Sequence, residues 1–136
     1  MRLSARSAVA LLLLSAAATA NAGQFNWHLT NHAVGYGDDE LKAVIADGIS
    51  SSSENASLGK DYTLNILVSG GSGNDRAAAP GMIVVQKIKP LQYGEVVYCS
   101  KYDFGTYTRA QLAEKLRDVM RVMPSYSVSS PDCRTS

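Results

Sequence analysis

The order of hydrophobic periodicities along the chain constrains its fold more than any other feature. Residues 24–29, 61–69, 82–89 and 95–104 read as strands, because apolar and polar residues alternate there or apolar runs are bounded by turns. Two further segments, from Asp38 and from Thr108, repeat apolar residues at helical spacing. The predicted order is therefore β-α-β-β-β-α. It predicts an α+β, two-layer sandwich in which two helices cover one face of a mixed four-stranded sheet.

Both predicted helices begin with clear signals. Asp38, Asp39 and Glu40 place negative charge at the positive end of the first helix dipole. Gly48 lies on the apolar stripe of that helix, which predicts a close approach to the sheet. The last helix opens with Thr108 and Gln111 at capping-box spacing.

The first 22 residues have the layout of a secretory signal peptide. Arg2 and Arg6 precede an apolar run over residues 8–18, and Ala20-Asn21-Ala22 supplies the small residues of a cleavage site. The run spans about 11 residues, whereas a membrane-spanning helix needs about 20. Cleavage after Ala22 would leave residues 23–136 as one α+β domain. We therefore expect a bacterial protein that is periplasmic or secreted, with no membrane span.

Composition and charge narrow the possible functions. Hydrophobic residues make up 46% of the chain and charged residues 18%, which is typical of a globular domain. The chain has 13 basic and 12 acidic residues, for a net charge of +1. Such a balance argues against nucleic acid as the partner and against a polybasic membrane binder.

The two cysteines, Cys99 and Cys133, are predicted to form one structural disulfide. An even count in an exported protein indicates a bridge, and a redox pair or a zinc site would need a different pattern. This bridge would tether the C-terminal tail and contribute roughly 3–4 kcal/mol in the chain-entropy model.

Catalytic and metal-binding signals in the sequence are weak. His28 and His32, with Asp38 and Asp39 nearby, are the only candidate metal or hydrolase set, and a third dedicated ligand is missing. The glycine-rich loop over residues 70–81 departs from the nucleophile-elbow, phosphate-loop and dinucleotide-loop patterns. The loop is interpreted as a mobile connection, with partner binding as the alternative. No cofactor and no metal are expected.

A partner surface is expected on the sheet face away from the helices. If the helices cover the side holding Leu64, Val96 and Tyr98, an apolar patch points outward. Its expected members are Leu67, Ile83, Val85 and Val97, with Tyr36 and Tyr93 as further contact candidates in turns. Tyr98 and Tyr102 are then expected in the core under the last helix. Cys99 shares the parity of Val97, so the tethered tail is expected to cover part of the patch.

These observations favour a non-enzymatic periplasmic or secreted protein-binding module: an inhibitor, an immunity-like protein or an envelope assembly adapter. Its expected partner is another envelope protein or a second copy of the chain. Two alternatives stay open. One is a small secreted hydrolase or metal-binding protein that uses the histidine–aspartate set, and the other is a structural envelope component.

Overall fold

Five strands form a single mixed sheet in the computed structural model, which describes residues 26–56, 62–125 and 133–135. The strands are β1 (Asn26–Ala33), β2 (Thr63–Gly70), β3 (Ala79–Pro90), β4 (Val96–Tyr107) and β5 (Cys133–Thr135), and they lie in the sheet in that order. β1 runs parallel to β2, and the other neighbouring pairs are antiparallel. The predicted parallel start and the β3–β4 hairpin are thus confirmed.

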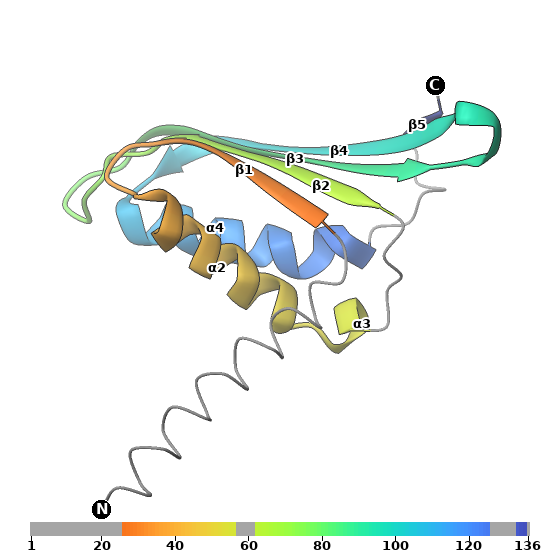
Figure 1. Ribbon diagram of the computed structural model, residues 1–136. Helices are drawn as coiled ribbons and strands as arrows, with labels where there is room; N and C mark the ends of the chain where they lie inside the picture. The colour runs from red at the N-terminus through yellow and green to blue at the C-terminus, as the bar shows by residue number, and fades with distance from the viewer. Residues whose placement is uncertain (1–25, 57–61, 126–132, 136) are drawn as a thin grey trace, which may run out of the picture.

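Two long helices, α2 (Asp38–Ser50) and α4 (Arg109–Val122), lie on one face of the sheet, and none of the described helices lies on the opposite face (Figure 1). A third helix, α3 (Ser53–Ala56), follows α2, and short 3-10 turns η1 (Gln92–Gly94) and η2 (Met123–Ser125) follow β3 and α4. The predicted α+β class is confirmed. The described residues form five strands and three α-helices, whereas four strands and two helices were expected. β5 and α3 were missed because segments of three and four residues are too short to show a periodicity.

The core lies between the two helices and the sheet. Its fully buried members are Leu41 and Ile45 of α2, Leu112, Leu116 and Met120 of α4, and Leu64, Val68, Val85 and Cys99 of the sheet. The predicted capping box of α4 is confirmed: the Thr108 hydroxyl accepts from the Gln111 amide at 3.2 Å, and the Gln111 side chain accepts from the Thr108 amide at 3.0 Å. The helices of the described residues include none that is long and apolar enough to span a membrane.

Gly48 packs against α4, whereas the sequence predicts a close approach of this residue to the sheet. A Cβ atom built on Gly48 would lie 2.6 Å from the Arg117 carbonyl oxygen and 2.9 Å from Cβ of Met120. The glycine therefore lets the backbones of the two helices approach closely. This close approach sets the spacing between α2 and α4.

The expected orientation of β3 and β4 is wrong. Ile83, Val85 and Val97 face the helices and are at most 7% exposed, whereas Tyr102, expected in the core, is 59% exposed. In β3 four consecutive apolar residues, from Met82 to Val85, hide the alternation.

In β4 the helix-facing side carries charged residues. Lys101 lies opposite Val85 in the sheet, and Asp103 lies opposite Ile83, so both side chains project toward α4. This side therefore looks polar in the sequence, although Val97 and Cys99 on the same side are buried. Tyr98 is likewise placed on the opposite side, away from the helices.

The disulfide joins Cys99 to Cys133, as predicted, but it lies on the helix side of the sheet. Cys99 is fully buried, and β5 pairs edge to edge with β4 from Val97 to Cys99. The described part of the tail therefore extends the sheet and does not cover its helix-free face. Residues 126–132 lie outside the described part of the chain, as does the predicted signal peptide.

Candidate functional site

The helix-free face of β1 to β4, called the open face below, is the candidate site. Residues directly opposite one another in neighbouring strands point to the same side of a sheet, so the register groups the outward side chains into rows. Four rows cross all four strands: His28–Asn65–Gln86–Ser100, Thr30–Leu67–Val84–Tyr102, His32–Ser69–Met82–Phe104 and, beyond the first of these, Asn26–Thr63–Ile88–Tyr98. The first row is polar throughout, and the next two become apolar or aromatic toward β4.

The open face is free of formal charge over its four long strands. At the outward positions of β1 to β4 that the structure describes, there is no lysine, arginine, aspartate or glutamate. The nearest charged side chain in register is Arg134 of β5, opposite Tyr98 at the margin of the sheet. In a chain with 18% charged residues, such a face is suited to contact with an uncharged surface.

Two large aromatic side chains stand exposed on this face. Tyr102 is 59% exposed and Phe104 is 69% exposed, and their rings are parallel within 3° with centroids 6.2 Å apart. Beside Tyr102 lies a shallow hollow of about 240 Å³, lined by residues of the first two rows and by Ile66. This volume is below the roughly 300–1,000 Å³ of pockets that enclose a small molecule. The hollow is therefore too small to enclose a small molecule.

Of the surface residues predicted from the sequence, the structure places Leu67 on the open face. Tyr93 is 97% exposed in η1, at the tip of the β3–β4 hairpin, with a φ of 63°. Tyr36 is instead used inside the fold: its hydroxyl donates to the Arg109 carbonyl oxygen at 2.5 Å, and its ring lies 4.1 Å from the Arg109 guanidinium carbon. Burial raises the pKa of Tyr36 above its usual value.

The structure separates the histidines from the aspartates. His28 and His32 are exposed on the open face, and four residues along a strand span roughly 13 Å, too far for both to bind one ion. Asp38 lies at the start of α2, where it accepts a hydrogen bond from Asn31 at 3.0 Å, and Asn31 alternates with the histidines toward the helix side. No group of three or more potential metal ligands occurs among the described residues. The candidate metal or hydrolase set is therefore not assembled.

The glycine-rich loop, interpreted from the sequence as a mobile connection, is attached to the start of α4 by hydrogen bonds. The Asp75 carboxylate accepts from the Ala110 amide at 2.7 Å, and the Asn74 carbonyl accepts from the Arg109 amide at 2.8 Å. A Cβ atom on Gly35 would lie 2.8 Å from the Gly73 backbone. Asp75 thus adds an acidic group at the N-terminus of α4, where the helix dipole favours it.

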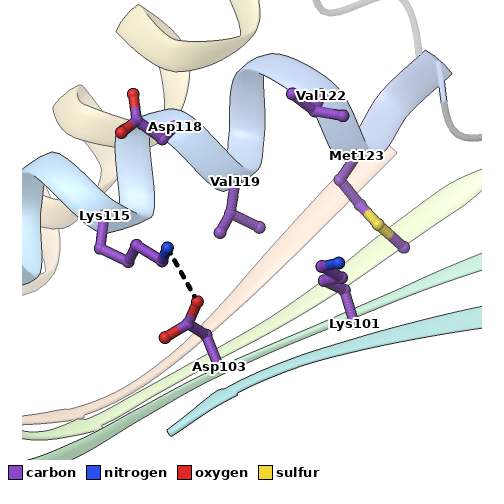
Figure 2. A pocket seen from close by; sticks show the side chains of 7 residues that line it. All are labelled: Lys101, Asp103, Lys115, Asp118, Val119, Val122 and Met123. Atoms are coloured by element: carbon purple, nitrogen blue, oxygen red, sulfur yellow. Dashed lines mark ion pairs between the residues drawn. The ribbon is translucent and has the colours of Figure 1, made fainter. Parts of the chain in front are cut away.

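A second hollow lies on the helix side, between α4 and the outer part of β4 (Figure 2). Val119, Val122 and Met123 supply its apolar wall, and the Lys115 ammonium forms an ion pair with Asp103 at 3.2 Å. Asp103 also accepts a hydrogen bond from the Tyr107 hydroxyl. This groove of about 220 Å³ therefore has a carboxylate that is already held by two partners.

Tyr107 is a poor acid–base catalyst in this arrangement. Burial, followed by the hydrogen bond to Asp103, raises the pKa of Tyr107 to about 12. A general acid or base works best with a pKa near the operating pH. The hydrogen bond from Tyr107 to Asp103 connects the end of β4 to the groove.

Lys87 is a buried charged residue that the sequence pattern did not single out. It is 6% exposed, its ammonium donates to the Pro124 carbonyl oxygen at 2.6 Å, and it lies 4.4 Å from the centre of the Tyr62 ring. The ammonium thereby holds the chain after α4 against the sheet. Both of these contacts are with groups of the core, so Lys87 is part of the scaffold behind the open face.

No family model matches this chain, and comparisons with curated proteins and with solved structures gave no significant match.

Proposed function

We propose that this chain is a non-enzymatic protein-binding module that holds another envelope protein or a second copy of the chain on its open face. The observation that carries the proposal is an uncharged sheet face on which Tyr102 and Phe104 are more than half exposed. Exposed apolar patches with aromatic residues and few charges are typical of protein–protein contact surfaces. An inhibitor, an immunity-like protein and an assembly adapter would all use such a face in the same way.

The architecture behind the open face supports this role. α2 and α4 pack on the other side of the sheet, and the buried core fixes each strand in register. A partner that docks on the open face therefore meets a surface whose backbone is already ordered. Preordered surfaces lose less conformational entropy on binding, which raises the affinity obtained from a given contact area.

The proposed setting is the periplasm or the exterior of a bacterial cell. It rests on the signal-peptide pattern of residues 1–22, with cleavage after Ala22, and a disulfide between Cys99 and Cys133 suits an oxidising compartment. A hydrolase gains no support from the site, because His28 and Asp38 belong to different parts of the fold. A structural envelope component would use the same open face for a permanent contact.

Site-specific photo-crosslinking in the native host tests the proposal. A photoreactive phenylalanine analogue replaces Tyr102, and a matched variant carries it at Val122, which is 54% exposed on the helix side. We expect a crosslinked protein product from position 102 and little or none from position 122. Product from position 122 alone would move the site to the groove beside α4. Absence of product from both positions would refute a protein-binding role for the open face.

A further inference from the structure

We infer that the open face of this chain pairs with the open face of a second copy, to give a symmetric dimer with the helices outside. The inference rests on the proposed function, because it assigns a partner to the same surface. In this arrangement the two sheets pack face to face, as in a β-sandwich, and α2 and α4 of each copy form the outer layers. The central rows of the open face would become the interior of the dimer.

The charge distribution favours a second copy over a charged partner. A symmetric dimer places the same surface patch on both sides of the contact, so any central charge would meet its own kind. The outward positions of β1 to β4 carry no lysine, arginine, aspartate or glutamate, whereas Lys101 and Asp103 project to the other side. A strongly charged partner would instead have to bury charges against a face that offers no opposite charge to pair with them.

The available area is sufficient for a specific contact. β1 and β2 each have 8 residues, and β3 and β4 match them over that length. Four strands about 4.8 Å apart and about 26 Å long cover roughly 500 Å². Two copies would together bury roughly 1,000 Å² or more, which is about the lower limit for a specific interface. We therefore expect a dimer with a dissociation constant in the micromolar range and not an obligate one.

The polar row can satisfy itself across a two-fold axis. His28, Asn65, Gln86 and Ser100 each carry both a hydrogen-bond donor and an acceptor, when the imidazole is neutral. Identical amide and hydroxyl groups can therefore bond to their counterparts, which identical charged groups cannot. The apolar side chains of the neighbouring rows, Leu67, Val84 and Met82, exclude water around these bonds.

Sedimentation velocity and light scattering over a dilution series test the inference. The protein is expressed from its complete coding sequence and purified with the disulfide formed. We expect a dimer at about 100 μM and dissociation on dilution, in keeping with the small interface. Tyr102→Glu should weaken the dimer at least about tenfold, since symmetry introduces the buried charge twice. Val122→Glu, which adds the same charge on the helix side, should leave the dissociation constant unchanged.

Phe104→Ser provides a second variant whose folding is insensitive to the change, because that ring is 69% exposed. It should also weaken the dimer, with an unchanged circular dichroism spectrum. A parent protein that remains monomeric at the highest concentration would overturn the inference. So would a dimer that persists in both variants. If the parent is monomeric but crosslinks to a different protein through position 102, self-pairing is refuted and the proposed function stands.

Discussion

Replacing Gly48 with alanine should destabilise the protein, although the same change stabilises most helices. Alanine in a helix interior is favoured over glycine by about 1 kcal/mol. At Gly48 the new methyl group would lie 2.6 Å from the Arg117 carbonyl oxygen, which cannot rotate away, and 2.9 Å from Cβ of Met120. An extra carbon in a packed site costs roughly 1–3 kcal/mol. The free energy of unfolding should therefore fall by about 1 kcal/mol, since the clash outweighs the gain in propensity.

Urea unfolding of three proteins separates the two contributions. The parent, Gly48→Ala and Ala43→Gly are unfolded in parallel, and the unfolding free energies are compared by linear extrapolation. Ala43 is exposed on the same helix, so Ala43→Gly measures the propensity difference in place, with an expected loss of about 1 kcal/mol. If Gly48→Ala raised stability by the amount that Ala43→Gly lowers it, the close packing of α2 on α4 would be incorrect.

Three further predictions concern the ends of the fold and its pH dependence. Cys133→Ala, with reductant present, should lower the unfolding free energy by about 2–4 kcal/mol. The same variant should leave the binding of a hydrophobic dye unchanged, because β5 lies at the sheet edge. A fluorescence titration with the dye checks this. The Glu40 carboxylate accepts hydrogen bonds from the Gly37 amide and from Arg109, and these contacts, that of Gly37 first, lower the pKa of Glu40 below its usual value. The stabilisation from these contacts is present above the usual pKa of glutamate and lost as pH falls through the lowered pKa. Arg109→Met should raise the pKa of Glu40 in a carboxyl NMR titration. N-terminal sequencing of the exported protein should begin at or near Gly23, and a chain that still began at residue 1 would contradict the signal-peptide prediction.

The strand and helix order could be predicted from the sequence because each long element carries its own period or cap. α2 extends from Asp38 to Ser50, and α4 begins after its Thr108 cap, close to the expected limits. The disulfide was also predictable, since the chain has two cysteines. These signals are local, so they do not depend on how the elements pack.

The orientation of β3 and β4 could not be predicted, because it depends on contacts between elements. Residues 82–85 are apolar on both sides of the strand, so alternation does not select a face. Lys87 is a buried lysine whose ammonium donates to a carbonyl group 37 residues away, at Pro124. Only the packed structure shows that the charged side of β4 faces α4, where Lys115 pairs with Asp103. As a result, the open face was anticipated, but only Leu67 of its four predicted strand residues lies on it.

The sequential strand order also has a consequence for biogenesis. Because β1 to β5 lie side by side in the order in which they occur in the chain, a chain that emerges N-terminus first from a ribosome or a translocon can add each new strand to one already outside. Domains form as units during such vectorial emergence. The Cys99–Cys133 bond can form only after the last strand has emerged. The disulfide therefore reports the emergence of β5, and a chain truncated before β5 would be left with an unpaired thiol at Cys99.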